Sequence, residues 1–236
     1  MQRALRVRIR RRPLNLLRLV PAKGVIMSSA TTTTRGLDRR YRTVDIVVIA
    51  TLAVAWGVIF WGWGKAYVPI SGLAVFSYPP SSAVLTGPWL VAGVLGGLIV
   101  RKPGAAFATE FLAAAVSSFI VGGTQWGWGV YASGFFQGLG AELIFLLFFY
   151  RRFGVVVAGL AGGLAGLVES VYEWTQGYAG TEWTYRFAYS GFMTVSGIVV
   201  AGVGSWFLVK ALADAGVLDA FEPGREAAAR EAAGTA

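Results

Sequence analysis

Apolar residues dominate the chain between positions 43 and 210, where they form six long runs separated by short polar or Gly- and Pro-rich segments. A transmembrane helix needs roughly 20 mostly apolar residues to cross the hydrocarbon core of a bilayer. Each run is close to this length. The sequence therefore predicts transmembrane helices over residues 45–64, 82–100, 104–121, 131–150, 154–176 and 187–210.

The composition supports a membrane protein. Hydrophobic residues make up 56% of the 236 positions and charged residues only 14%, which leaves too little polar surface for a soluble globule. We expect an all-α, polytopic fold, with the six-helix transmembrane domain at 43–212, a basic N-terminal segment at 1–42 and a cytoplasmic tail at 213–236.

Residue types and a motif that the sequence lacks exclude several classes of enzyme. The sequence has no cysteine and no histidine, which excludes thiol chemistry, the usual zinc ligands and the usual general base. No Gly-rich loop ending in Lys-Ser or Lys-Thr is present, so the chain has no Walker-type ATP site of its own. We expect no catalytic residues, no cofactor and no metal site, and a transporter subunit rather than an enzyme.

Basic residues mark every second connection between the predicted spans: Arg39, Arg40 and Arg42, then Arg101-Lys102, Arg151-Arg152 and Lys210. Short cytoplasmic loops carry an excess of Lys and Arg. The pattern predicts a multi-pass protein of the cell membrane with both termini in the cytoplasm.

The net charge of +9 comes mainly from the first 26 residues, which hold eight basic residues and no acids. A charge this localised does not indicate nucleic-acid binding. Three interpretations stay open for segment 1–42: translation starts at Met27 instead, a basic arm lies on anionic lipid, or the segment is a transit peptide.

The opposite connections are aromatic and nearly uncharged. They cover residues 65–81, 122–130 and 177–185 and contain Trp, Tyr and Gln side chains together with several prolines. Part of this enrichment is the aromatic belt typical of a membrane interface. The other part is consistent with a ligand site near the outer face, closed by the long first loop.

Several polar side chains lie inside the predicted spans, where a carboxylate is costly and usually faces the bundle interior. Glu169 and Glu173 are four residues apart and share one helix edge. Protonated acids bonded between helices would give the same pattern. The predicted substrate-binding residues are Trp61, Trp63, Gln125, Trp126, Tyr131, Gln137, Glu142, Glu169, Tyr172 and Glu173, whereas Glu110 is expected to pair with a nearby Arg or Lys.

Five segments of the sequence form a recognisable set: Thr43–Ala50, the Arg-Lys-Pro-Gly-Ala-Ala run at 101–106, Gln125-Trp126-Gly127, the Gln-Gly-Leu-Gly-Ala-Glu-Leu run at 137–143 and Tyr150-Arg151-Arg152. Together these segments resemble the YkoE family of energy-coupling factor (ECF) transporter S components. The resemblance extends from about Thr43 to Lys210.

This resemblance implies an S-component-like bundle that captures thiamine or its hydroxymethylpyrimidine moiety. It also implies partners: a transmembrane T subunit and two ATPase subunits. Small residues on the first span, Ala50, Ala53 and Gly57, are then the expected T-subunit contact, although small residues of this kind also serve internal packing.

Two other functions are considered. An ion-coupled secondary transporter or channel for a small organic cation needs acids along a continuous path. The acids here are concentrated in the middle and outer half, which argues against such a path. A membrane enzyme is disfavoured because no Ser or Lys lies in a recognisable catalytic spacing.

Overall fold

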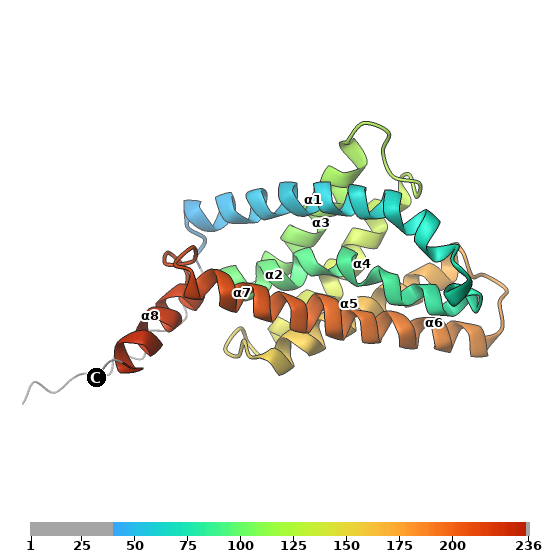
Figure 1. Cartoon of the computed structure of the whole chain (residues 1–236). Coiled ribbons are helices and arrows are strands. Elements are labelled where there is room, and N and C mark those ends of the chain that lie inside the picture. Colours follow the sequence, from blue (N-terminus) through green and yellow to red (C-terminus); the bar gives the residue numbers. More distant parts are fainter. Residues whose placement is uncertain (1–39, 235–236) are drawn as a thin grey trace, which may run out of the picture. The chain divides into compact units, whose positions relative to one another are not determined.

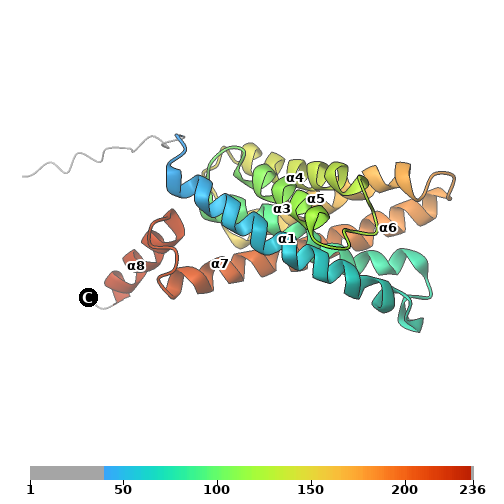
Figure 2. The same ribbon diagram turned by 90° about the horizontal axis from the view of Figure 1, so that it is seen from above.

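The computed structural model describes residues 40–234, and every regular element within this range is helical. Figures 1 and 2 show the long helices packed side by side, followed by the short C-terminal helix α8. The elements are α1 (Thr43–Ser71), η1 (Ala74–Phe76), η2 (Pro79–Leu90), α2 (Val91–Val100), α3 (Ala105–Phe119), α4 (Gly129–Leu147), α5 (Val155–Gln176), α6 (Trp183–Ser196), η3 (Gly197–Gly204), α7 (Ser205–Asp214) and α8 (Glu222–Gly234). The predictions for residues 1–39 lie outside the described residues.

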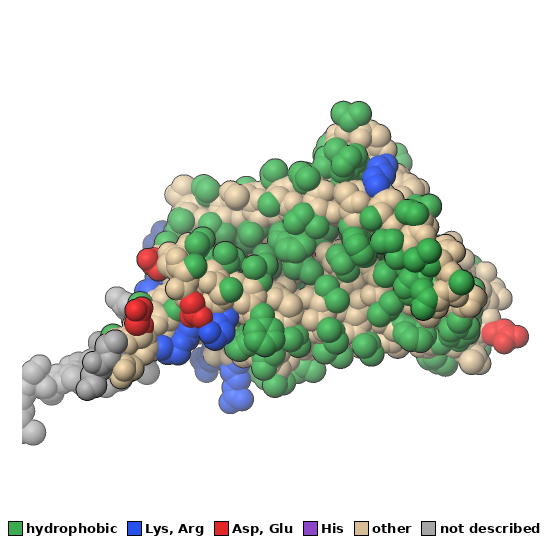
Figure 3. All heavy atoms as spheres, in the orientation of Figure 1, with side chains coloured by type: hydrophobic (Ala, Val, Ile, Leu, Met, Phe, Trp, Pro, Cys, Tyr) green, Lys and Arg blue, Asp and Glu red, His purple; other side chains and the backbone are tan. Residues whose placement is uncertain are grey.

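The six predicted spans are confirmed. Five segments are long and apolar enough to cross a membrane, namely Thr43–Ser71, Pro79–Val100, Gly129–Leu147, Val155–Gln176 and Trp183–Asp214, and Ala105–Phe119 is a shorter apolar helix between them. Hydrophobic side chains cover the flank of the bundle seen in Figure 3. This surface suits lipid contact, since lipid replaces water around such a bundle.

The two ends of the bundle differ in chemistry. One end carries Arg101, Lys102, Arg151 and Arg152 in the α2–α3 and α4–α5 connections, and we call it the basic end. The other end carries the connections at 72–78, 120–128 and 177–182, and we call it the aromatic end.

The second span changes helix type midway. Residues Pro79–Leu90 form a 3-10 helix of 12 residues, which is long for this helix type, and α2 continues from Val91. Pro88 lies near the junction and prevents a continuous α-helical ladder. Neighbouring side chains satisfy the irregular backbone: Ser196 Oγ accepts from Gly87 N at 2.9 Å, and Trp63 Nε1 donates to Leu85 O at 2.9 Å.

Close backbone packing joins the fifth span to the sixth. A Cβ atom built on Gly162 of α5 would lie 2.1 Å from the carbonyl oxygen of Gly197, at the start of the π-helical segment η3. Only glycine permits this approach. It brings α5, which carries Glu169 and Glu173, directly against α6.

The structure corrects the expectation that Ala50, Ala53 and Gly57 of α1 together form the contact with the T subunit. Ala53 is 2% exposed, and a Cβ on Gly57 would lie 2.6 Å from Val116 of α3, so both residues pack inside the bundle. The small residues allow α1 and α3 to approach closely, which is the internal-packing alternative. Of the three expected contact residues, only Ala50 is exposed.

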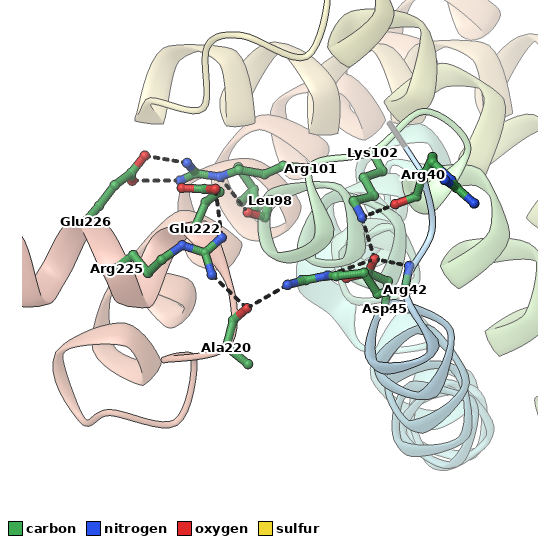
Figure 4. A network of polar contacts seen from close by, with 10 residues as sticks. All are labelled: Arg40, Arg42, Asp45, Leu98, Arg101, Lys102, Ala220, Glu222, Arg225 and Glu226. Atoms are coloured by element: carbon green, nitrogen blue, oxygen red, sulfur yellow. Dashed lines mark hydrogen bonds and ion pairs between the residues drawn. The ribbon is translucent and has the colours of Figure 1, made fainter. Parts of the chain in front are cut away.

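The C-terminal segment folds back onto the basic end rather than extending as a tail. Arg101 makes a bidentate ion pair with Glu226 of α8 at 2.5 and 2.9 Å, as Figure 4 shows. Arg42 Nη1 donates to Ala220 O at 3.3 Å, and Phe221 is only 4% exposed. Residues 218–227 therefore contribute to the core at this end of the molecule.

A second ion cluster ties the start of α1 to the α2–α3 turn. Asp45 is fully buried and accepts from Arg42 Nη2 at 2.8 Å and from Lys102 Nζ at 2.5 Å (Figure 4). Tyr41 donates to Pro103 O at 2.9 Å, and burial, with the nearby charges of Glu142 and Asp45, raises the pKa of Tyr41 to about 12. The basic end is thus closed by packed, hydrogen-bonded groups.

Candidate substrate-binding site

A cavity of about 410 Å³ extends from the loops of the aromatic end into the middle of the bundle. All six spans contribute to its lining. Its rim includes Thr124, Trp126 and Tyr178 from the loops, and its deep part includes Gln137 and Glu169. The size is in the range of small-molecule sites, which are typically about 300–1,000 Å³.

Two carboxylates stand on the α5 side of the cavity. Glu169 is 1% exposed; its Oε1 accepts a hydrogen bond from Ser133, and its Oε2 is buried without a hydrogen-bond partner. Glu173, one turn further toward the aromatic end, accepts from the hydroxyl of Tyr189. Among the ion pairs found within residues 40–234, none involves either acid.

Aromatic rings form the opposite wall around Trp89. Its ring centroid lies 5.3 Å from that of Tyr67 and 5.0 Å from that of Trp126, in edge-to-face geometry. The Nε1 of Trp61 is buried without a hydrogen-bond partner, and Lys65 Nζ lies 5.8 Å from the Trp61 ring centroid. The cavity thus offers a free N–H donor as well as the free acceptor of Glu169.

Tyrosines complete the rim beside Glu173. Tyr178 lies with its ring centroid 4.6 Å from that of Tyr189, and Tyr185 packs against Tyr178 at 5.3 Å. Burial raises the pKa of Tyr178 above its ordinary value, so the buried hydroxyl is neutral over the whole range in which the subunit works.

Seven of the ten predicted substrate-binding residues line this cavity: Trp61, Gln125, Trp126, Gln137, Glu169, Tyr172 and Glu173. Trp63 and Tyr131 do not. The indole of Trp63 is hydrogen-bonded to η2, and the hydroxyl of Tyr131 bonds to Ser118 Oγ at 2.7 Å. Because Trp63 is two residues from Trp61, the helix turns it to a different face.

Glu142 also lies outside the cavity, and its assignment is corrected. Its Oε1 accepts from Gly104 N at 2.6 Å and from Tyr150 Oη at 2.5 Å, and its Oε2 accepts from Phe107 N at 3.3 Å. The carboxylate caps the N-terminus of α3, where unpaired backbone N–H groups favour a negative charge. Glu142 therefore has a structural role near the basic end.

Glu110 has a structural contact of another kind, and the expected basic partner is not found among the ion pairs of residues 40–234. Its Oε2 accepts from Gly93 N at 2.6 Å, in the first turn of α2. The change from 3-10 to α-helix leaves this N–H near the helix start, and the buried carboxyl satisfies it.

Sequence reasoning missed several lining residues, among them Tyr67, Trp89, Ser133, Tyr178, Tyr189 and Met193. Tyr67 and Tyr178 lie in outer segments that the sequence marks as aromatic, so their general location was visible. Trp89 and Ser133 gave no signal, because a single Trp or Ser within an apolar span is ordinary. Their role depends on the faces that η2 and α4 turn inward.

The fold and cavity define a class of membrane subunit, a six-helix bundle with an internal cavity of small-molecule size. Residues 44–168, more than half of the chain, match the family described as "ABC-type cobalt transport system, permease component", and the chain belongs to this family. Among residues 40–234, no group of three or more His, Cys, Asp or Glu side chains is placed to hold a metal ion.

Two individual proteins refine this class. The chain is 28% identical over 192 residues to "Putative HMP/thiamine permease protein YkoE" of Bacillus subtilis (strain 168), covering 80% of this chain and 92% of the relative. It also matches the "Crystal structure of an S-component of ECF transporter" with a TM-score of 0.77 and 25% identity, over 83% of this chain and 98% of that one. These matches confirm the resemblance to YkoE-type proteins and the S-component fold, and the chain is an S component of an ECF transporter.

Proposed function

We propose that this S component binds thiamine or its hydroxymethylpyrimidine moiety in the cavity at the aromatic end. The observation that carries this proposal is the unpartnered Oε2 of Glu169 inside an aromatic cavity. A buried acceptor without a partner is costly, and a ligand N–H group would satisfy it. The aminopyrimidine ring presents such N–H groups together with a flat face.

The charge of the cavity favours a cationic or N–H-rich ligand. Glu169 and Glu173 have no Arg or Lys partner among the ion pairs of the described residues. The thiazolium ring of thiamine carries a positive charge, which carboxylates and ring faces both attract. The similar protein of Bacillus subtilis is named as an HMP/thiamine permease, which agrees with this ligand class.

We also propose the orientation and partners of the subunit. Cytoplasmic loops are enriched in Lys and Arg, so the basic end faces the cytoplasm and the cavity opens outward. The chain lacks a Walker motif of its own, so its energy source is a transmembrane T subunit with two ATPase subunits. The exposed side of α1, which includes Ala50, is the proposed contact surface for the T subunit.

Calorimetric titration of the detergent-purified chain tests the ligand. Thiamine and hydroxymethylpyrimidine are titrated separately, with riboflavin and biotin as controls. Selective, saturable binding of the first or second supports the proposal and identifies the recognised moiety. If neither binds, the proposed substrate is wrong, while the S-component class is unaffected.

Reconstitution tests the partners. Uptake into vesicles should require the T subunit and ATP and should be unaffected by ionophores. Uptake by the isolated chain that ionophores abolish would instead support the ion-coupled secondary transporter.

A further inference from the structure

Four polar side chains form a row along the deep wall of the cavity, from Glu110 on α3, behind the lining, through Gln137 and Ser133 on α4 to Glu169 on α5. Gln137 is in the middle. One end of its amide lies 2.9 Å from Ser133 Oγ, and the other end lies 3.2 Å from both Glu110 Oε1 and Trp89 O. Ser133 Oγ in turn lies within hydrogen-bond distance of Glu169 Oε1. The two acids are thus connected through an amide and a hydroxyl.

The two orientations of the Gln137 amide give two arrangements of the hydrogens along these contacts. In the first, Gln137 Nε2 donates to Ser133 Oγ, and the single proton of Ser133 is donated to Glu169 Oε1. Glu169 Oε1 is then an acceptor and needs no proton. The carbonyl end of Gln137 faces Glu110 Oε1 and Trp89 O; a proton on Glu110 makes the first contact a hydrogen bond, and the contact with Trp89 O stays unpaired.

In the second arrangement the amide is turned. Gln137 Nε2 donates to Trp89 O and to an ionised Glu110, and its carbonyl oxygen accepts the proton of Ser133. Because Ser133 has no second proton, Glu169 must be protonated and donate to Ser133 Oγ. The contacts of each arrangement require one acidic proton, on Glu110 in the first and on Glu169 in the second.

We propose that Gln137 is a positioning residue whose amide orientation links the protonation of Glu110 to that of Glu169. The link decides whether Glu169 presents a free acceptor or a neutral acid to the cavity. Converting one arrangement into the other removes one proton from Glu169 and adds one to Glu110, so no acid or base from elsewhere is needed. Its consequence for a ligand rests on the proposed function: a ligand cation or N–H group at Glu169 selects the arrangement with Glu110 protonated.

Other titratable groups near the row do not replace this link. Glu173 and Tyr172 lie on α5 beside Glu169, and Tyr189 of α6 donates to Glu173. The ammonium of Lys65 on α1 lines the outer cavity and bonds to Gly122 O and Gly123 O at 3.4 and 3.3 Å. The side-chain hydrogen bonds of Glu173, Tyr189 and Lys65 described above lead away from Gln137 and Ser133.

The test is carboxyl ¹³C NMR of the ligand-free chain labelled at the glutamate side-chain carboxyls, since this resonance separates protonated from ionised acids. In Glu110→Gln the new amide nitrogen donates to Gln137 and fixes the first arrangement, so the Glu169 resonance should lie at its ionised position. In Glu169→Gln the new amide donates to Ser133 and fixes the second, so the Glu110 resonance should lie at its ionised position.

The matched control repeats both substitutions in a Gln137→Met background. Met fills similar space without a hydrogen bond, so the remaining acid should no longer be held ionised there. Ionisation of the remaining acid that persists in this background would show that the acids act on each other through space, and the role of Gln137 would be refuted. A protonated Glu169 in Glu110→Gln, or a protonated Glu110 in Glu169→Gln, would refute the link itself. If one single variant fails to fold, the other provides the same reciprocal test.

Adding thiamine to the wild-type chain separates this proposal from the proposed function. If thiamine binds, Glu169 should be ionised and Glu110 protonated in the complex, and a complex with Glu169 protonated or Glu110 ionised would refute the link. If thiamine does not bind, the proposed substrate fails, and the ligand-free variants still decide the role of Gln137.

Discussion

Replacing Glu173 with glutamine removes one negative charge from the cavity while keeping the shape of the side chain. The Tyr189 hydroxyl, which donates to Glu173, keeps an acceptor in the amide oxygen. The expected change is therefore the loss of a charge-assisted contact to the ligand rather than the loss of the local fold. Such a contact is worth about 1–3 kcal/mol, which corresponds to a Kd for thiamine raised roughly 5- to 150-fold.

Calorimetry with two ligands makes this prediction specific. Thiamine carries the thiazolium charge and hydroxymethylpyrimidine does not, so Glu173→Gln should weaken thiamine binding more than hydroxymethylpyrimidine binding if the carboxylate meets the cation. Glu142→Gln is the matched control, because that carboxylate caps α3 outside the cavity. Thiamine affinity unchanged by Glu173→Gln, or lowered equally by both variants, would refute the reasoning.

The remaining predictions concern stability and docking. Glu142→Gln should lower the apparent melting temperature of the purified chain, since replacing the charged cap of α3 costs about 1–2 kcal/mol; an unchanged melting curve would contradict the capping role. Arg101→Ala and Glu226→Ala should show a coupling of about 0.5–1 kcal/mol in a double-mutant cycle of unfolding, and additive effects would mean that the pair contributes nothing. Gly57→Leu should reduce the yield of folded protein, because its side chain would overlap α3, whereas Ala50→Leu should keep ligand binding and reduce uptake by the assembled transporter. Normal uptake by Ala50→Leu would remove Ala50 from the proposed docking surface.

Part of the candidate site could be predicted from the sequence, because a charged residue inside an apolar span is expected to face the interior of the bundle. Glu169 and Glu173 illustrate this, since the bilayer makes each carboxylate costly and turns it toward the interior. The same argument fails for Glu142, which is also buried but is hydrogen-bonded to the N-terminus of α3. Residue type alone does not separate a ligand contact from a helix cap, because both uses satisfy a buried carboxylate.

By itself, the sequence determined the six spans, their apolar outer surface and the chemical difference between the two ends of the bundle. These properties follow from the length of each apolar run and from the free-energy cost of placing polar groups in lipid. Both depend only on residues that are neighbours in the sequence. Only the tertiary structure decided which side of each helix faces inward, why Ala53 and Gly57 pack against α3, and how Trp89 and Ser133 join the cavity. It also decided that residues 218–227 close the basic end. The physical reason is that these features depend on the packing of side chains from distant segments, which hydropathy along one chain does not encode.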